Sequence, residues 1–343
     1  DNTPTVLGKL DGFGFDIAQV DLFGANNELL GTTNQNICGA WGITSSTLAD
    51  GTHNLTAKAT DRAGNVSVAS AALQIVVDTV IATSAAPDLD DASDTGTSNS
   101  DNLTSDTTPT FSGTVEPNSN VTVSSDVAGV LGNVTADGSG VWSYTVSTAL
   151  SAGVHNISIV EEDVAGNISA SSAVLALTID NTAPQISSNA PASGSTPGAE
   201  SVVFAVSFDD TVYNISTNDF TLVTTGTAGT VSAVSVTSGA SVNVTVSNLT
   251  GDGTVRLDHI TSDITDLAGN VLAAYSTGTA HIVDRAAPAL TSVDFTQIAV
   301  DSVNQTNLSV AVSFGGTETS TLEANYSISS SAGGTAITGS ATV

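Results

Sequence analysis

The sequence predicts an all-β chain made of several small β-sandwiches that follow one another end to end. Two observations support this prediction. Short stretches of alternating apolar and polar residues recur along the chain, bounded by Gly, Asn, Asp and Pro, which is typical of strands joined by turns. A five-residue motif also returns at a nearly fixed period, as DRAGN at 61–65, DVAGN at 163–167 and DLAGN at 266–270. A repeat of about one hundred residues indicates a tandem array of domains.

The alternating stretches give the individual strands. The clearest are LQIVV at 73–77, WSYTV at 142–146, VLALTI at 174–179, VVFAVSF at 202–208 and VNVTV at 242–246. No stretch keeps a period of 3.6 residues between capping residues, so we expect almost no helix. Several short, two-faced, antiparallel strands in each hundred residues describe an immunoglobulin-like β-sandwich.

An aspartate follows each copy of the motif and marks the predicted edge of a domain: Asp78, Asp180 and Asp284. The predicted units are therefore 1–78, 79–180, 181–284 and 285–343. Because DNTPT at the start of the chain matches DTTPT at 106–110, we expect the first unit to lack the opening part of its domain. The last unit is too short for a sandwich of about 100 residues, so we expect it to be the first part of an incomplete fourth domain.

The chain is strongly acidic, with 34 acidic residues against 5 basic ones and a net charge of −29. No basic patch is available to neutralise phosphate groups, so nucleic acid and anionic membrane surfaces are poor partners, and we expect neither nucleic-acid binding nor membrane insertion. The frequent Val, Ile and Thr residues argue against a disordered acidic chain. The acidic groups must therefore be solvated or matched by a cation.

Cysteine content and apolar segments bear on the location of the protein. A lone cysteine, Cys38, has no partner for an intrachain disulfide. No apolar run is long enough to span a bilayer, and no signal peptide is visible at the start. A long β-chain without disulfides suggests an exported protein of a bacterial surface, and we expect an extracellular location.

Several sequence words, in order, resemble known repeats. The stretch 87–123, followed by GVWSYTV, GVHNISI, DVAGN and IDNTAP, is similar to the bacterial Ig-like repeats of giant RTX-type and biofilm-associated surface adhesins. FDDTVYNISTNDFTL and ITDLAGN in the third unit resemble a second repeat subtype of the same proteins, and SAGGTAITGSATV resembles part of a third. The resemblance implies an exported extender with calcium at the junctions between modules.

The acidic motif fits calcium chemically. Calcium takes six to eight oxygen ligands from carboxylates, carbonyls and amides. In D-x-A-G-N the glycine permits a positive φ, so that the flanking Asp and Asn converge. An ordinary turn of the chain is the alternative explanation of each motif, and three copies at a fixed distance from an edge aspartate favour the ion.

Topology predicts which acidic residues meet. The motif lies between the last two strands of a sandwich, so it should face the linker from the preceding domain. We expect Asp163 and Asn167 to approach Asp78 and the 88–106 loop. We expect Asp266 and Asn270 to approach Asp180 and Asn181, and Asp61 and Asn65 to approach Asp1. Asp284 should have no motif partner. The predicted metal ligands are Asp1, Asp61, Asn65, Asp78, Asp88, Asp90, Asp94, Asp101, Asp106, Asp163, Asn167, Asp180, Asn181, Asp266, Asn270 and Asp284.

Catalysis finds no support in the sequence. None of the common catalytic motifs occurs, and His53 and His155 occupy matching places in two repeats, which favours a structural role. Trp41 and Trp142 precede comparable strands and are most simply packing residues; sugar stacking is the alternative.

Three functions remain open. The first is a non-catalytic extender of a cell-surface adhesin, stiffened by calcium, whose partners are neighbouring repeats, with any glycan or host ligand bound by regions outside this segment. The second is a subunit of an extracellular filament or surface layer that assembles by strand complementation between chains. The third is a carbohydrate-binding module.

Overall fold

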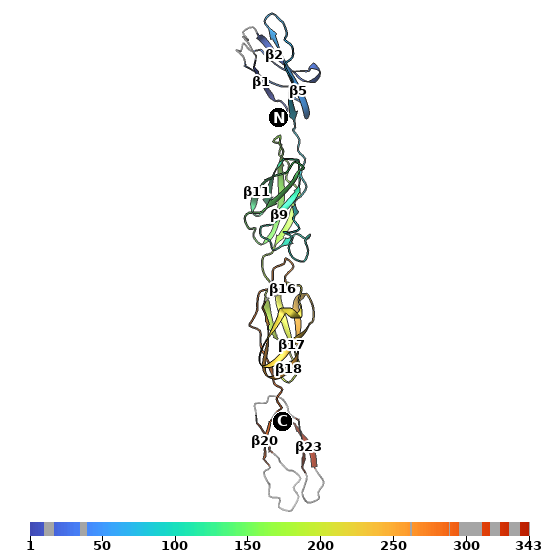
Figure 1. Cartoon of the computed structure of the whole chain (residues 1–343), viewed down its shortest axis with the longest axis vertical. Helices are drawn as coiled ribbons and strands as arrows, with labels where there is room; N and C mark the ends of the chain where they lie inside the picture. The colour runs from blue at the N-terminus through green and yellow to red at the C-terminus, as the bar shows by residue number, and fades with distance from the viewer. Residues whose placement is uncertain are drawn as a thin grey trace, which may run out of the picture.

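The computed structural model describes residues 1–9, 17–34, 40–260 and 263–287, together with the backbone of four strands between 289 and 342. Three β-sandwiches follow one another along a single long axis (Figure 1), as the repeat predicts. Each has its own core of buried aliphatic and aromatic side chains, with no core residue shared between sandwiches. Among the described residues, no helix is long and apolar enough to cross a bilayer.

The first sandwich contains a two-stranded and a four-stranded sheet, with strand orders β1-β4 and β3-β2-β5-β6. Its strands are β1 (Thr5–Lys9), β2 (Ile17–Phe23), β3 (Leu29–Thr33), β4 (Ala40–Thr44), β5 (Gly51–Asp61) and β6 (Leu73–Val77). Alternation points one face of each strand inward, so that Leu22 and Leu55 are almost fully buried. Cys38 lies outside the described residues.

The second sandwich has sheets of five and three strands, ordered β11-β10-β13-β14-β8 and β12-β9-β7. The strands are β7 (Asp88–Leu89), β8 (Leu103–Thr104), β9 (Thr110–Thr114), β10 (Asn120–Ser125), β11 (Gly129–Thr135), β12 (Val141–Thr145), β13 (Gly153–Glu162) and β14 (Leu175–Ile179). Trp142 and Phe111 fill the core. The predicted strands at 142–146 and 174–179 are therefore confirmed within a residue at each end.

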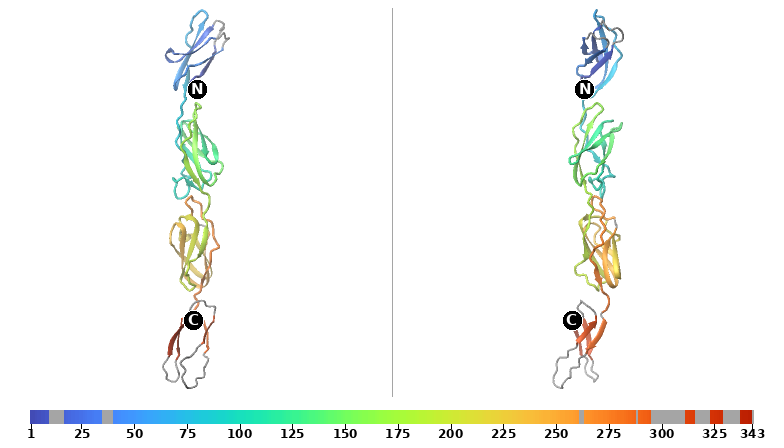
Figure 2. Two further views of the ribbon diagram at one scale, coloured as in Figure 1. Left: turned by 180° about the vertical axis from the view of Figure 1, so that it is seen from behind. Right: turned by 90° about the vertical axis from the view of Figure 1, so that its left-hand side faces the viewer.

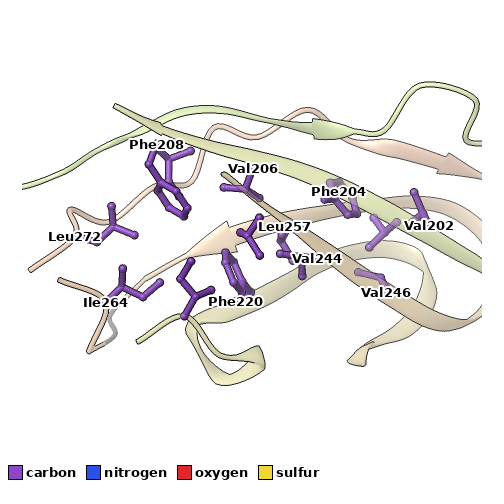
Figure 3. Packing of buried hydrophobic residues seen from close by; sticks show 14 of the residues in the cluster. Val202, Phe204, Val206, Phe208, Phe220, Val244, Val246, Leu257, Ile264 and Leu272 are labelled. Carbon is purple, nitrogen blue, oxygen red and sulfur yellow. The ribbon is translucent and has the colours of Figure 1, made fainter. Parts of the chain in front are cut away.

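The third sandwich is built differently. Its strands are β15 (Ile186–Pro191), β16 (Ser201–Val212), β17 (Phe220–Val234), β18 (Gly239–His259) and β19 (His281–Val283), with order β15-β16-β18-β17 and β19 also paired to β18. The pairing of β17 with β18 shifts register between Thr225 and Thr227. Gly226, at this shift, and Gly251, the partner of Thr227, have φ of 71° and 75°, and a side chain at Gly226 would collide with the carbonyl of Asp252. Phe204, Phe208 and Phe220 lie among the aliphatic core residues (Figure 3).

Two antiparallel strand pairs follow the third sandwich. They are β20 (Ala289–Asp294) with β21 (Ala311–Gly315), and β22 (Glu323–Ile328) with β23 (Ile337–Thr342).

The chain takes an unexpected path between the first two sandwiches. After β6 it runs along the side of the second sandwich to the far end, where the 90–106 segment forms a loop (Figure 2). Ser84 still lies at the end of the second sandwich that faces the first, since its hydroxyl donates to Glu161 near the end of β13. Further on, Leu89 pairs with Phe111 and Thr104 pairs with Ile179. The acidic loop therefore belongs to the end of the domain that faces the third sandwich.

Candidate functional site

The D-x-A-G-N motif forms a self-closed turn in all three copies. In the second copy, Asp163 Oδ1 accepts from the backbone N–H of Asn167 at 2.8 Å, and Oδ2 accepts from Asn167 Nδ2 at 2.8 Å. Gly166 takes a φ of 89°, which a glycine adopts without steric cost. Burial raises the pKa of Asp163, but the hydrogen bonds from Asn167 outweigh it and leave the pKa lowered. The primary structural role of the Asp163 carboxylate is therefore to close the turn.

The same turn also touches the preceding domain, as topology predicts. Asn167 Nδ2 donates to the backbone carbonyl of Asp78 at 3.2 Å, and Asn270 Nδ2 donates to that of Asp180 at 2.8 Å. These are bonds between the last residue of one sandwich and the turn of the next. The expected approach of the motif to the edge aspartate is confirmed at both junctions.

Three carboxylates gather at the second junction. Ligand oxygens of Asp180, Asp210 and Asp266 all lie within 4.8 Å of one another. Asp180 comes from the end of the second sandwich, and Asp210 and Asp266 come from the third. Two unit charges 4 Å apart repel by about 1 kcal/mol in water and about 4 kcal/mol at an effective dielectric of 20. Three oxygens of hard carboxylate type at this spacing are a donor set that suits calcium.

Asp210 was not predicted from the sequence. It lies near the end of β16, next to Asp209, whose backbone N–H donates to the Gln185 carbonyl at 3.0 Å while its Oδ1 accepts from Gln185 N at 2.7 Å. This pair of bonds holds the linker against β16 and so brings Asp180 to Asp210. The FDDT stretch carries no repeated word, and only the strand register identifies the residue.

The first junction is acidic too, but more open. Asp78, Glu116 and Asp163 line a hollow of about 400 Å³. Burial and then the negative charges of Glu161, Asp163 and Asp78 raise the pKa of Glu116. Glu161 is buried, and its Oε1 accepts from the backbone N–H of Glu116 at 2.7 Å. Sequence reasoning missed both glutamates because they lie outside the repeated motif.

The predicted approach of the 88–106 loop to Asp163 and Asn167 is wrong. The loop lies at the opposite end of the second sandwich and contacts the third: Thr95 Oγ1 donates to the Ala268 carbonyl at 2.7 Å, and Thr97 N donates to that of Leu267 at 3.3 Å. The prediction failed because the chain first runs the length of the domain before the loop begins.

The predicted approach of Asp61 and Asn65 to Asp1 is also wrong. Asp1 lies near the start of β5, because the neighbouring Asn2 carbonyl accepts from Leu48 N at 2.8 Å. Asp61 ends β5, which has 11 residues, so the two lie about 30 Å apart along the strand. Asp1 instead caps Thr3, as Asp106 caps Thr108 in the second sandwich. The match of 1–5 to 106–110 places Asp1 at the wrong end for the predicted site.

The remaining predicted ligands are spread out. Asn181 is exposed, and Asp88 is exposed on the short strand β7. Asp284 Oδ1 accepts from Ala286 N at 3.3 Å, next to Asp252, which accepts from the N–H groups of Arg285 and Ala286. Asp90, Asp94, Asp101 and Asp106 all belong to the loop at the second junction.

The histidines and tryptophans have structural places. His53 Nε2 lies 2.7 Å from the Ala49 carbonyl, and His155 Nε2 lies 2.9 Å from that of Ser151, so the two repeats use the residue in the same way. Trp142 is buried in the core, where its ring has no face available for a sugar, and Trp41 packs against the core of the first sandwich.

Comparison with known proteins agrees with this architecture. A family model described as a bacterial Ig-like domain matches residues 1–79 and 81–181, and a second model with the same description matches 180–280. No curated protein matches the chain.

The matches among solved structures include tandem repeats of adhesins. One, described as a tetra-tandem repeat in the extending region of a large adhesion protein, is 20% identical, with 100% of this chain and 84% of that chain covered and a TM-score of 0.34. Another, from work on a 1.5-MDa bacterial ice-binding adhesin, is 19% identical over 78% of this chain and 87% of that chain, with a TM-score of 0.33. A third, a biofilm-associated protein BSP domain, is 19% identical over 53% of this chain, with a TM-score of 0.21, and the chain spans only 28% of its length.

Proposed function

Because the chain belongs to the bacterial Ig-like domain family, we propose that it is an extender segment of an exported bacterial cell-surface adhesin, with calcium stiffening its junctions and no catalysis of its own. An extender must hold whatever lies at its two ends at a distance from each other. End-to-end sandwiches with separate cores provide that length, and the junctions then decide whether the array bends.

One observation carries the proposal: the carboxylates of Asp180, Asp210 and Asp266 meet within 4.8 Å at the boundary of two sandwiches. Asp180 belongs to one domain and the other two belong to the next, so any group held by all three ties the domains together. Asp266 is only 2% exposed, and its two oxygens keep their bonds to Asn270. A calcium ion held there would offset two of the three negative charges and would take its remaining ligands from other oxygens or water.

The energetic argument is about bending. Extracellular calcium modules bind with dissociation constants of about 10⁻⁴–10⁻³ M. At millimolar calcium a 10⁻⁴ M site adds about 1.4 kcal/mol to the state that binds it. That is a small part of the stability of a sandwich, but it acts on the junction alone.

The test is small-angle scattering of the full chain in millimolar calcium and in chelator, on the native sequence and on Asp210→Asn. Asp210 takes no part in the bonds that close the 266–270 turn, so Asp210→Asn removes one negative charge from the donor set and leaves the turn intact. We expect chelator to broaden the distribution of interatomic distances of the native chain, and Asp210→Asn to show the broadened form in calcium.

Asp91→Asn is the matched control. Asp91 is exposed in the 90–106 loop, and its substitution changes the net charge by the same amount. It should behave as the native chain does in both conditions. Identical scattering of the native chain with and without calcium would overturn the role of calcium, and growth of the particle with protein concentration would favour the filament instead.

A further inference from the structure

The longest run of this chain without a charged residue covers residues 220–251. It holds no Asp, Glu, Lys or Arg, although the whole chain has a net charge of −29. The run forms strand β17 and the first half of β18 in the third sandwich. Two copies of so acidic a chain repel each other over most of their surface. At β17 a second copy can approach without like charges meeting.

Strand β17 is also an edge strand. It pairs with β18 on one side, and no backbone hydrogen bond joins its other side to the part of the chain that the structure describes. The strand has 15 residues, and none of them after Phe220 is buried. Unpaired N–H and C=O groups along an exposed strand are a template on which a further strand can pair.

The first part of β17, residues 220–225, is the part best suited to such pairing. Its ladder with β18 runs without a shift from the pair Phe220 and His259 to the pair Thr225 and Thr254, and register shifts begin only after Thr225. Bulges of this kind protect an edge by twisting it away from a partner. Proline and charged side chains are the other common protections, and residues 220–225 contain neither.

The charges beside this edge cancel within one copy. Thr221 and Val223 lie opposite Asp258 and Arg256 on β18. Arg256 Nε donates to Asp258 Oδ1 at 2.7 Å and Nη2 donates to Oδ2 at 2.8 Å, so the two charges are paired with each other. Val223 is 40% exposed, which leaves apolar surface available to a partner. The edge and the strand behind it therefore present a neutral, partly apolar surface.

We propose that residues 221–225 of two copies of this chain pair as antiparallel edge strands and join two arrays side by side. A two-fold axis at Val223 places this residue opposite its own copy and Thr221 opposite Thr225, so that like side chains meet on one face. The strands of the third sandwich run mainly along the length of the array (Figure 1), so the two arrays run in opposite directions.

Such a pair closes at two copies, because each edge is used once. Arrays that project toward each other from two facing surfaces run in opposite directions, so the pairing suits contact between two cells that carry this chain. Only this last interpretation rests on the proposed extender. The pairing itself depends neither on the adhesin role nor on calcium.

The test is sedimentation velocity of the full chain in chelator, over a range of protein concentrations. We expect a monomer–dimer equilibrium that shifts toward the dimer with salt, because the Debye length falls from about 10 Å at about 0.1 M to about 3 Å at about 1 M and the acidic sandwiches then repel less. Val223→Glu sets two like charges opposite each other on the paired edges and should weaken the dimer about tenfold or more.

Ile282→Glu is the matched control. Ile282 is a β-branched residue that is 62% exposed, and it lies on β19, which pairs with β18 on the side away from residues 220–225. The substitution therefore adds the same charge to the opposite edge of the same sheet. The Ile282→Glu chain should dimerise as the native chain does, and melting curves show whether both variants fold.

Disulfide trapping tests the orientation. In a Cys38→Ser background, Thr221→Cys should form a disulfide with Thr225→Cys when the two variants are mixed, and neither should form one with its own copy. A native chain that stays monomeric at both salt concentrations, a dimer no weaker in Val223→Glu than in Ile282→Glu, or absence of the mixed disulfide would each overturn the proposal. A particle that keeps growing with protein concentration would also overturn it, in favour of a filament.

Discussion

The hydrogen bond from Asn270 to the preceding domain should make this turn more costly to disrupt than the matching turn of the first sandwich. Asn270 Nδ2 donates to Asp266 Oδ2 at 2.9 Å and to the Asp180 carbonyl at 2.8 Å. Asn65 Nδ2 donates to Asp61 Oδ2 at 2.8 Å, and no described residue of another sandwich accepts from it. Substituting each by Ala therefore removes the same internal bond in both cases and the interdomain bond only in Asn270→Ala.

The magnitudes follow from bond counts. A net hydrogen bond contributes about 1 kcal/mol, and one to a charged group about 1.5–3 kcal/mol. Asn65→Ala should cost about 1 kcal/mol, below the range for a charged group, because Asp61 is partly exposed and solvent screens its charge. Asn270→Ala should cost about 2–3 kcal/mol, since Asp266 is buried and a second bond is lost. A gap of about 1.4 kcal/mol is a tenfold change in the opening equilibrium.

Native-state hydrogen exchange read by mass spectrometry measures this domain by domain. It should be carried out in chelator, so that loss of the turn is not mixed with loss of an ion. Asn167→Ala, whose interdomain bond is longer at 3.2 Å, should fall between the other two. A cost for Asn270→Ala no larger than that for Asn65→Ala would refute the view that these turns dock one domain on the next.

Three other predictions concern the same junctions. Gly96→Ala should loosen the contact between the second and third sandwiches in scattering and exchange experiments, because the new Cβ would collide with the Leu267 carbonyl. Gly129→Ala, also at a positive φ but with nothing within 4 Å of the new Cβ, should only lower the stability of the second sandwich, by about 1 kcal/mol. Equal effects of the two substitutions on the junction would contradict the role of Gly96 in this contact. Asp163→Ala should destabilise the second sandwich by about 2 kcal/mol, and so lower its melting temperature, in chelator as well as in calcium, because Asn167 loses both carboxylate oxygens that accept from it; an effect confined to calcium would show that the carboxylate serves the ion alone. In chelator, the melting temperature of the second sandwich should rise as the pH falls from 7 towards the ordinary values of 4.5 for Glu116 and 3.8 for Asp94, because a raised pKa adds stability that is complete below the ordinary value and lost as pH rises. Below pH 3.8 the melting temperature should fall again as Asp126, Asp137 and Asp163, whose pKa values are lowered, become protonated. A melting temperature that falls steadily from pH 7 downwards would contradict the raised pKa values of Glu116 and Asp94.

The sequence predicted the strands, and predicted that each turn faces the preceding domain, because both follow from local patterns. Alternation gave β6 at Leu73–Val77 as the structure has it. The position of the motif between the last two strands placed Asn167 against Asp78 and Asn270 against Asp180. Antiparallel topology is enough for such a prediction, because consecutive strands must reverse direction.

The prediction of the site residues failed where segments distant in the sequence meet in the structure. Asp210 and Glu116 reach the junctions from strand ends that carry no repeated word, so only the register of β16 and β9 brings them there. The 88–106 loop was predicted to lie with Asp78 at the first junction, but it lies at the other end of the domain. The stretch before β7 crosses the whole domain, which its composition does not reveal.

The repeated turn has a reason to end in asparagine and not in aspartate. An asparagine amide has two N–H groups. In the second and third copies one serves the aspartate of its own turn and the other serves the carbonyl of the preceding domain. An aspartate at the same place would have no donor for either partner and would add a further negative charge to a junction that already holds several. The exposure of the turn follows this use: Asp163 is 8% exposed and Asp266 2%, while Asp61, whose turn has no described interdomain bond, is only partly buried. The motif therefore closes its own loop in all three copies and, in the second and third, also docks on the preceding domain. The carboxylates gathered around it are then the part of the junction that responds to a cation.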